Sequence, residues 1–475
     1  MKNKLLTAAG LFCLSFALTT CGRDSPLLPD GITWQPVPYG GPPTTAINLI
    51  FSSDPGDLSA GDIIIDSAGG AVTRTGFSGG GTLWVVGITV QNPGYVSVNI
   101  DRQGIESRVQ AVRVADETEN GGDVGDNNPA VARFQRYMSR QTFEEMFPRR
   151  NGSPGWRAEM PHPHFPDWQN FTDDYFSYDN LLEAIRFMSN LEVREYSRGG
   201  LDLWNSPTHN QWDEWNTETR VLNRATGGTV IIRTGSEFNA PHLAGGTLVG
   251  RTVVNFGNFL NHASPNDRIR ELAAFFANAS HETSASGAAA PGSTAELGWS
   301  FFYKEEIAYR GATSSPYNQY EYLGVTFPPV PGQSYHGRGP FQLSWNTNYA
   351  LFSMTVLGNR DLLNRPATLL EDGVLGWKSA IWFWMHQPGY RPSMHQVISG
   401  NWSAPQQAIA RGWSANPADF GYTIMVINGG LEGNLTEADG RIARRAAYYR
   451  AFLARLGGNP RPGERLHTAG VSTFW

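Results

Sequence analysis

The chain has 475 residues, which is too long for one small hydrophobic core, so two or three domains are expected. Its formal net charge of -6 argues against a nucleic-acid-binding surface. The 15 Trp, 17 Tyr and 25 Phe are a heavy aromatic load, which suits either large cores or a cleft that stacks on sugar rings.

The N-terminus predicts export. A short basic start precedes an apolar run, Leu5 to Leu18, of signal-peptide length. The run leads into "LTTCG", which resembles the lipobox of bacterial lipoproteins, with Cys21 as the lipidated first residue, although Thr20 stands where Gly, Ala or Ser is usual. The alternative is an incidental cysteine near a conventional cleavage site. The only other cysteine, Cys13, lies inside the predicted signal peptide (residues 1–21), so no disulfide is expected in the mature chain.

A Pro/Gly-rich linker is predicted over residues 22–43, followed by short β-type runs over residues 44–115. The runs "INLIF", "DIIID", "TLWVVGITV" and "YVSVNI" are separated by Gly- and Ser-rich turns, which predicts a small all-β sandwich resembling a bacterial immunoglobulin-like (Ig-like) module. With no cluster of titratable groups, this module is a spacer or a weak carbohydrate-binding module. Residues 116–130 are acidic and Gly-rich and predict a second linker.

Residues 131–475 predict a mainly α-helical domain. The segments "RFQRYMSRQTFEEMF", "DNLLEAIRFMSNLEVREY" and "GWKSAIWFWMHQ" have helical amphipathic patterns. Two stretches near residues 151–174 and 197–257 are rich in Trp, His, Asn, Pro and Gly and are interpreted as insertions. The second contains a possible hairpin strand at Gly228 to Gly235.

One helix is expected to begin after Ser264, which supplies an N-cap hydroxyl before Pro265. Its apolar stripe consists of Leu272, Phe275, Phe276 and Ala279. The same spacing continues to Glu282, and burial there would raise the carboxyl pKa, as a general acid requires. Alternatively, the stripe ends early and Glu282 is solvated. A zinc helix of the His-Glu-x-x-His type is disfavoured, because Ala285 occupies the second histidine position.

The motifs "SHET", "YHGRGPFQLSWNTNY" and "INGG" occur in series, and together they closely resemble family-19 glycoside hydrolases, the plant-type chitinases. The similarity extends from about Arg140 to Arg450, interrupted by the two insertions. It implies a lysozyme-like, two-lobed helical domain that hydrolyses β-1,4 linkages between N-acetylglucosamine units of chitin or chitooligosaccharides. It also implies that no metal and no organic cofactor are needed.

By motif, the resemblance implies Glu282 as general acid, Glu306 as general base and Ser344 as the hydroxyl that helps to hold the attacking water. The neighbour Glu305 stands at a position that is often Gln in relatives, so it is the competing choice for the base. Inverting hydrolysis needs two carboxyls roughly 6.5–9.5 Å apart, with room for a water between one of them and the sugar.

The resemblance also implies a set of substrate-binding residues, and each residue type can hydrogen-bond sugar hydroxyl or N-acetyl groups. They are His281, Tyr335, Gln342, Asn348, Lys378, Asn428 and Arg445. Taken singly, each could instead cap a helix or lie on a solvated face. Arg445 and Glu432 are expected to form an ion-pair network behind the base.

The chain departs from the plant pattern in two respects. Disulfide cysteines of the plant proteins are replaced by Phe302 and Gly433, so the frame must be held differently. The loop between Ser314 and Ser334 aligns poorly, and Tyr320 or Tyr322 is a candidate replacement for the sugar-stacking tryptophan found there in plants.

The sequence therefore predicts an exported, lipid-anchored, monomeric, endo-acting chitinase with an Ig-like spacer and no nucleic-acid partner. Two alternatives remain open. One is a lysozyme-like hydrolase of peptidoglycan, which has the same type of β-1,4 backbone. The other is a chitin-binding protein without activity, which the presence of both carboxylates and the serine argues against.

Overall fold

The computed structural model describes most of the chain after the N-terminal region. The described residues are 32, 34–39, 44, 46–67, 71–92, 94–105, 109–114, 128–171, 173–199, 214–285, 294–311, 320–323, 326–386 and 391–475. The predicted signal peptide, Cys21 and most of both predicted linkers lie outside them.

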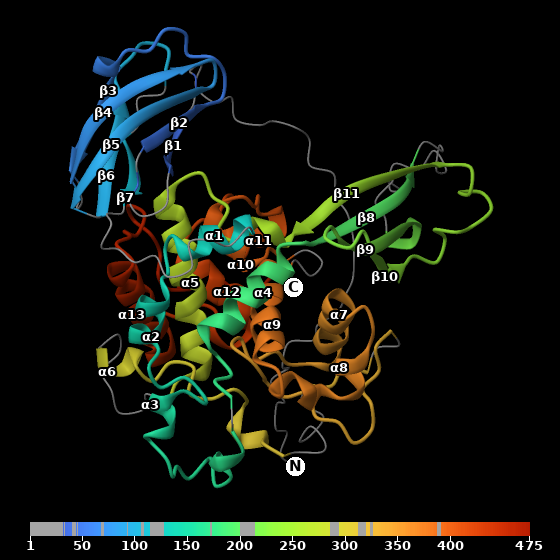
Figure 1. Ribbon diagram of the computed structural model, residues 1–475. Coiled ribbons are helices and arrows are strands. Elements are labelled where there is room, and N and C mark those ends of the chain that lie inside the picture. Colours follow the sequence, from blue (N-terminus) through green and yellow to red (C-terminus); the bar gives the residue numbers. More distant parts are fainter. Residues whose placement is uncertain are drawn as a thin grey trace. The chain divides into compact units, whose positions relative to one another are not determined.

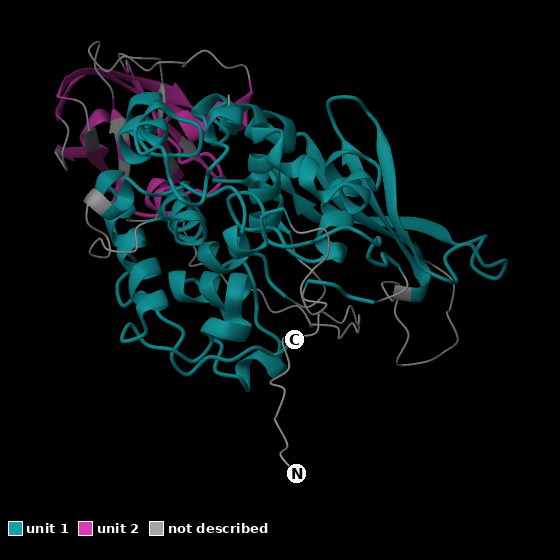
Figure 2. Cartoon of the chain, turned by 90° about the horizontal axis from the view of Figure 1, so that it is seen from below, with its two compact units in different colours: residues 1–19, 140–260, 270–475 teal, residues 20–139, 261–269 magenta. Residues whose placement is uncertain are grey.

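The chain divides into two compact units (Figure 2). Unit 2 comprises the described residues of Thr20–Ser139 and Asn261–Ile269, and unit 1 those of Arg140–Leu260 and Arg270–Trp475.

Unit 2 contains two antiparallel sheets (Figure 1). The strands are β1 (Trp34–Tyr39), β2 (Ala46–Phe51), β3 (Ile63–Ser67), β4 (Ala71–Gly80), β5 (Leu83–Asn92), β6 (Gly94–Ile100) and β7 (Gln110–Val114). One sheet has the order β1-β2-β5-β4 and the other β3-β6-β7. Buried residues of both sheets, including Ile47, Val86 and Val98, belong to one hydrophobic cluster. The assignment of these sheets to an Ig-like module stays a prediction.

Strand β1 lies inside the segment predicted as a linker. Trp34 is buried, and β1 pairs along its whole length with β2. The prolines at positions 36 and 38 obscure this strand in the sequence, because proline cannot donate to a sheet. They are tolerated here because β1 is the edge strand of its sheet.

Helices dominate the rest of the described chain. They are α1 (Pro129–Gln135), α2 (Arg140–Met146), α3 (Pro154–Arg157), α4 (Tyr178–Met188), α5 (Pro265–Thr283), α6 (Thr294–Leu297), α7 (Asn346–Val356), α8 (Asp361–Asn364), α9 (Gly373–Met385), α10 (Met394–Ser399), α11 (Gln406–Ile409), α12 (Phe420–Glu432) and α13 (Gly440–Arg455). Short 3-10 turns are η1 (Ala60–Asp62), η2 (Trp168–Asn170), η3 (Glu214–Asn216), η4 (Phe256–Asn258), η5 (Ile307–Tyr309) and η7 (Pro366–Leu370). Among the described residues, none of the helices is long and apolar enough to span a bilayer.

Helix α5 carries Glu282 in its last turn and is buried on all sides along most of its length. Ser264 accepts a hydrogen bond from the Asp267 backbone N–H, and Pro265 is the first helical residue, as the capping pattern predicts. Every residue from 269 to 280 is buried. A helix that is buried all round is a core element, so its C-terminal turn has a well-fixed position.

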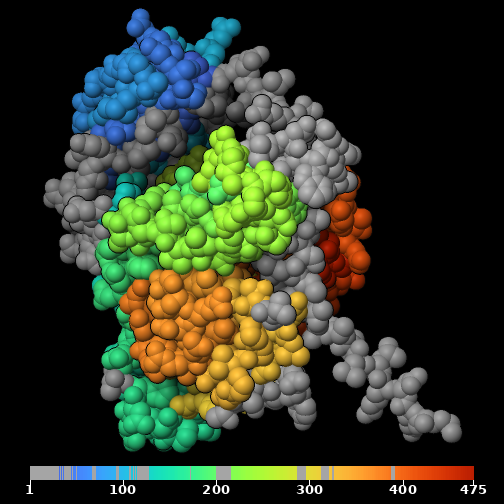
Figure 3. Space-filling model, turned by 90° about the vertical axis from the view of Figure 1, so that its right-hand side faces the viewer, coloured from blue at the N-terminus to red at the C-terminus, as the bar shows by residue number. Residues whose placement is uncertain are grey.

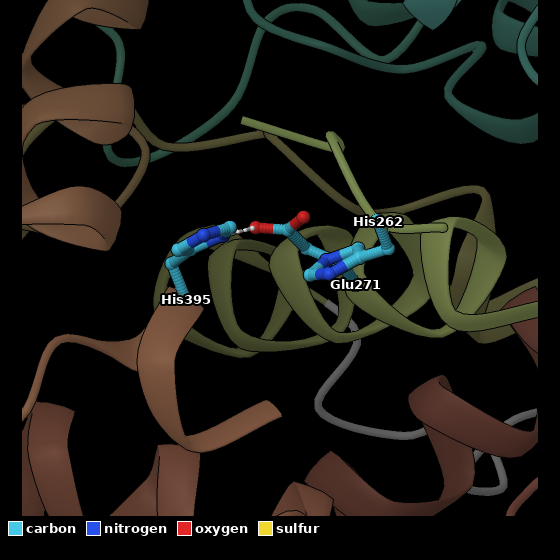
Figure 4. A group of neighbouring side chains, drawn as sticks. All are labelled: His262, Glu271 and His395. Atoms are coloured by element: carbon cyan, nitrogen blue, oxygen red, sulfur yellow. Dashed lines mark hydrogen bonds and ion pairs between the residues drawn. The ribbon is translucent and has the colours of Figure 1, made fainter. Parts of the chain in front are cut away.

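A buried carboxylate ties α5 to its neighbours (Figure 4). Glu271 is fully buried and accepts a hydrogen bond from His395 Nδ1 at 2.6 Å, the contact drawn in Figure 4. It also accepts from Trp384 Nε1 at 2.7 Å and from the Leu260 backbone N–H at 2.8 Å. A buried carboxylate is costly unless it is paired or hydrogen-bonded, and here three donors satisfy it. The bonds fix α5 against α9 and α10, and so fix the frame that ends at Glu282.

The segment from Asp179 to Tyr196 corrects the sequence prediction of one amphipathic helical run. Helix α4 ends at Met188, and strand β8 (Leu191–Gly199) begins after a short turn. The turn is held by a 2.8 Å hydrogen bond from the Arg224 N–H to the Asn190 carbonyl. Tertiary pairing decides the outcome, because β8 is hydrogen-bonded to strands on both of its edges.

The second predicted insertion forms most of a four-stranded antiparallel sheet, which extends from the helices in Figure 1. Its order is β10-β9-β8-β11, with β9 (Thr217–Asn223), β10 (Thr229–Thr234) and β11 (Thr247–Asn255). Strand β10 coincides with the predicted hairpin strand. It packs beside α7, and the surfaces of the sheet (green) and of the α7–α8 region (orange) adjoin in Figure 3.

Candidate active site

Glu282 is half-buried at the end of α5, with 21% of its side chain exposed. Arg445 of α13 donates a hydrogen bond to its Oε1. Burial raises the pKa of Glu282, Arg445 lowers it, and the negative charges of Glu432 and Glu306 raise it again. The net shift is upward, so this carboxyl keeps its proton to a higher pH than an ordinary glutamate. That is the protonation state a general acid needs.

Arg445 also binds Glu432, so one buried guanidinium holds two carboxylates. It donates to Glu432 Oε2 at 2.9 Å and Oε1 at 2.8 Å, and to Asn278 Oδ1 at 3.1 Å. Burial raises the pKa of Glu432, but the charge and hydrogen bonds of Arg445 and the Asn428 amide more than offset this, and its pKa is lowered. The expected ion pair between Arg445 and Glu432 is present, but the network contacts Glu282 and not the predicted base, Glu306.

Asn428 reaches the network because α12 is kinked. Its backbone has non-helical angles within that helix, and its Nδ2 donates to Glu432 Oε1 at 2.7 Å. Asn278, which the sequence reasoning missed, lies one helical turn before Glu282 on α5. A four-residue spacing places two side chains on one helix face, and this signal could have identified it.

His281 lies beside Glu282 and is half-buried. Burial, together with the charges of Arg445, Arg444 and Arg441, lowers its pKa well below the ordinary value. The imidazole is therefore neutral near pH 7. Within the described part of the chain, its buried Nδ1 has no hydrogen-bond partner.

Glu306 is held from both sides of its carboxylate. Its backbone N–H donates to the Gly337 carbonyl at 2.8 Å, and the Gly337 N–H donates back to Oε2 at 3.3 Å. The Tyr320 hydroxyl donates to Oε1 at 3.2 Å. Gly337 is required at this point, because a Cβ there would lie 2.9 Å from the Gln342 side chain.

Glu305 has different partners from its neighbour Glu306. It is buried, forms an ion pair with Arg310 at 3.2 Å, and contacts His336 Nε2 at 3.4 Å. Lys304, on the other side, donates to the Leu370 carbonyl at 2.9 Å and lies over an aromatic ring, 4.8 Å from the centroid of Phe171. The two residues anchor the segment, whereas the Glu306 carboxylate keeps acceptor capacity for a water.

The two candidate catalytic carboxyls lie within electrostatic range of each other. The charge of Glu306 contributes to the raised pKa of Glu282, and both carboxylates help to raise the pKa of the Tyr320 phenol, after burial. The structure thus brings together two carboxyls whose surroundings differ, one among buried helix residues and one hydrogen-bonded by a phenol and a backbone amide.

Ser344, Gln342 and Asn348 lie together where the Gly-Arg-Gly loop enters α7. Ser344 Oγ donates to the Gln342 carbonyl at 2.8 Å, Gln342 Nε2 donates to the Gly339 carbonyl at 2.9 Å, and Asn348 Nδ2 donates to the Ser344 carbonyl at 2.9 Å. Gln342 adopts a left-handed backbone with φ of 49°. Hydrogen bonds among the residues that the motif identified therefore stabilise the loop.

The two remaining predicted residues have contacts of another kind. Lys378 on α9 is half-buried, with its Nζ 3.8 Å from the centroid of the Phe187 ring. Tyr335 is fully buried, and its hydroxyl accepts from the Val330 N–H at 2.9 Å and donates to the Leu363 carbonyl at 2.7 Å. Tyr335 thus supports the loop from its inner side. Its role in sugar binding, like that of the other site residues, stays a prediction.

Comparison with known families gives one match. Residues 249–467 match the model of glycoside hydrolase family 19 described as "Chitinase class I". This region therefore carries a family-19 domain, and the prediction of a glycoside hydrolase of the chitinase type is confirmed for it. The Ig-like module and the lipoprotein signal stay predictions.

Two plant relatives illustrate the similarity. The chain is 38% identical over 193 residues to "Basic endochitinase B" of Arabidopsis thaliana, covering 41% of this chain and 53% of that protein. It is 38% identical over 185 residues to "Inactive chitinase-like protein 1" of Hevea brasiliensis, covering 39% and 54%. This chain thus spans about half the length of these relatives. Chitinase C of Streptomyces griseus HUT6037 aligns at 23% identity and a TM-score of 0.39, over 72% of this chain and 99% of that chain.

Proposed function

We propose that this protein is an endo-acting chitinase that hydrolyses β-1,4 linkages between N-acetylglucosamine units with inversion. One observation carries the proposal, namely that the carboxyls of Glu282 and Glu306 have different surroundings. Burial and nearby negative charge raise the pKa of Glu282, whereas Glu306 accepts hydrogen bonds at both oxygens from neutral donors. Environments that separate an acid from a base are the mark of a two-carboxylate glycosidase.

In the proposed reaction, Glu282 gives its proton to the glycosidic oxygen of the leaving sugar. Glu306 takes a proton from a water that attacks the anomeric carbon on the opposite face of the ring. Each hydrolysis leaves Glu282 ionised and Glu306 protonated, and proton exchange with solvent restores the starting state. No covalent sugar–enzyme bond forms on this route.

Ser344 supports the water by accepting a hydrogen bond. Its hydroxyl proton is already donated to the Gln342 carbonyl, so the lone pairs of Oγ are the groups left for a water. Substrate would be held by the side chains that the family resemblance assigns to sugar contacts. These are His281, Gln342, Asn348, Lys378 and Asn428, whereas Tyr335 and Arg445 are fully buried and support the loop and Glu282, respectively.

The alternative of a binding protein without activity has one observation in its favour, because a similar relative carries the name "Inactive chitinase-like protein 1". Against it, Glu282, Glu306 and Ser344 are all present in this chain. The second alternative, a hydrolase of peptidoglycan, uses the same two-carboxylate chemistry on a related backbone.

We test the function by giving the full chain a chitin hexamer and purified peptidoglycan in parallel, from one enzyme batch. We expect internal cleavage of the hexamer to shorter oligomers and little release of muropeptides. Efficient muropeptide release with negligible hexamer cleavage would overturn the chitinase assignment and leave the two-carboxylate site standing. Tight hexamer binding without cleavage of either polymer would favour the binding protein.

The N-terminal sequence supports a further part of the proposal, an exported protein anchored through lipid on Cys21. An apolar run of signal-peptide length leads into a cysteine in a lipobox-like setting. The all-β unit then serves as a spacer between the lipid and the hydrolase domain, and the protein acts as a monomer facing the periplasm or the cell exterior.

A further inference from the structure

Tyr320 makes a contact that its sequence position did not suggest. The sequence offers it as a candidate sugar-stacking residue, but its hydroxyl donates to Glu306 Oε1 at 3.2 Å. The other oxygen of that carboxylate receives the Gly337 N–H at 3.3 Å. One donor on each oxygen fixes the rotation of the carboxylate about its last bond.

The segment carrying Tyr320 is held on the start of α7 by a buried amide. Asn346 is fully buried, and its backbone N–H donates to the Tyr320 carbonyl at 3.2 Å. Its side chain accepts from the Tyr322 N–H at 2.7 Å and donates to the Tyr322 carbonyl at 2.8 Å and the Phe327 carbonyl at 2.6 Å. Asn346 lies two residues after Ser344, so the phenol and the serine loop are placed by the same structural element.

The backbone and ring of Tyr320 are constrained as well. Its φ is 63°, a left-handed value that a tyrosine adopts only where its surroundings impose it. The ring lies edge-on to Trp345, with 5.7 Å between centroids, and to Tyr309, with 6.0 Å. These contacts direct the hydroxyl to Glu306 and occupy ring edges around it.

We propose that Tyr320 is a positioning residue for the base, which orients the Glu306 carboxylate and favours its ionised form. This inference rests on the proposed function, in which Glu306 activates the water. A hydrogen bond to the ionised form of a carboxyl stabilises that form. With Oε1 held by the phenol, the water is received by the remaining lone pairs on the side of the serine loop.

The phenol itself stays a neutral donor, because burial and the charge of Glu306 raise the pKa of Tyr320. Other titratable groups also lie near Glu306, and they must be the same in the wild type and in any variant compared with it. They are Glu282 of α5, Tyr349 of α7, and the neighbouring Glu305 with its partners Arg310 and His336. A substitution that removes only the hydroxyl leaves all of them in place.

The test is Tyr320→Phe, with Tyr303→Phe as matched control. Tyr303 lies three residues before Glu306, and its hydroxyl contacts His164 Nδ1 at 3.0 Å, so the control removes a phenol of the same segment. With chitin hexamer, Tyr320→Phe should lower kcat about tenfold with little change in KM, as expected for loss of a hydrogen bond to a charged group. The acid limb of its pH profile should move upward by roughly one pH unit. Tyr303→Phe should change neither quantity.

A second measurement does not depend on activity. In protein labelled with ¹³C at the glutamate carboxyls, the Glu306 signal is assigned by its loss in Glu306→Gln, and its titration is followed in wild type and Tyr320→Phe. We expect the variant to take up its proton at higher pH. An unchanged titration together with an unchanged acid limb would overturn the inference, as would a change confined to KM, which indicates sugar stacking. Failure of the proposed function would instead appear as a wild-type chain that does not cleave the hexamer.

Discussion

Arg445 is fully buried and donates a hydrogen bond to Glu282. The same guanidinium holds Glu432, so two carboxylates share one buried cation. Removing one member of such a group is strongly destabilising, because the remaining charges are left buried without compensation. Glu282 is therefore fixed in place by a network that links Arg445 to residues 13 and 163 positions away in the chain.

Glu282→Gln should lower kcat on chitin hexamer by about 10²- to 10⁴-fold, the usual contribution of a positioned general acid. The amide keeps the shape of the side chain and a contact for Arg445, so hexamer binding should be retained. Initial rates and calorimetric titration measure the two effects. Glu437→Gln, at a surface ion pair with Arg450, is the control and should behave as wild type. Wild-type turnover in Glu282→Gln would remove Glu282 from the acid role.

Glu306→Gln should be nearly as damaging to kcat, because the amide cannot take a proton from water. Glu305→Gln should retain most of the activity but lower the free energy of unfolding by about 1–3 kcal/mol, since it weakens the buried pairs with Arg310 and His336. Hexamer hydrolysis and denaturant unfolding separate the two outcomes. The reverse pattern, an inactive Glu305→Gln and an active Glu306→Gln, would move the base by one residue.

Glu432→Gln should shift the alkaline limb of kcat/KM to lower pH. The acid must be protonated, so activity falls as pH rises through the pKa of Glu282. The charge of Glu432 helps to raise that pKa, and its removal also leaves Arg445 free to stabilise ionised Glu282. Both effects lower the pKa of Glu282. A pH profile between about pH 4 and 9, the range around ordinary glutamate and histidine values, measures the shift. An alkaline limb that stays in place or moves to higher pH in Glu432→Gln would contradict the proposed role of Glu282.

Cys21→Ala should release the protein from membranes, because bacterial lipoproteins carry several acyl chains on the N-terminal cysteine, and stable anchoring takes more than one chain. Fractionation of cells that produce wild type or variant, followed by immunoblotting, measures the distribution. Mass spectrometry of the wild-type N-terminus gives an independent check. A mature N-terminus beyond residue 21 that carries no lipid would refute the anchor.

Local signals in the sequence predicted the main frame well. Helix α5 begins at the predicted cap, because Ser264 and Pro265 are a strong helix start whatever surrounds them. Its burial was underestimated, since an apolar stripe does not reveal a helix that is covered on every side. Strand β8 was missed because the residues after Met188 fit a helical period, and only pairing with β9 and β11 makes them a strand.

The sequence predicted candidate site residues, but it could not predict the contacts that these residues make. Motifs identified Glu282, Glu306 and Arg445, but which carboxylate Arg445 binds depends on how α5, α12 and α13 pack. The surroundings of Glu305 and Glu306 differ because the backbone is extended here, and successive side chains of an extended backbone point to opposite sides. One side chain therefore meets Arg310 and His336, and the other meets Tyr320. Tyr320 lies in a segment whose sequence resembles no motif, and its place is set by the buried Asn346.

The stereochemistry of the first product tests the central claim, that Glu306 activates water directly while Glu282 protonates the leaving oxygen. Chitin hexamer is cleaved in an NMR tube, and the anomeric signals of the new reducing ends are followed over the first minutes, before mutarotation equilibrates them. Direct attack by water on a β-linkage gives the α-anomer first, and this is the predicted result. Initial formation of the β-anomer would require a nucleophile or the acetamide of the substrate itself in place of water, and it would contradict the role of Glu306 as the base.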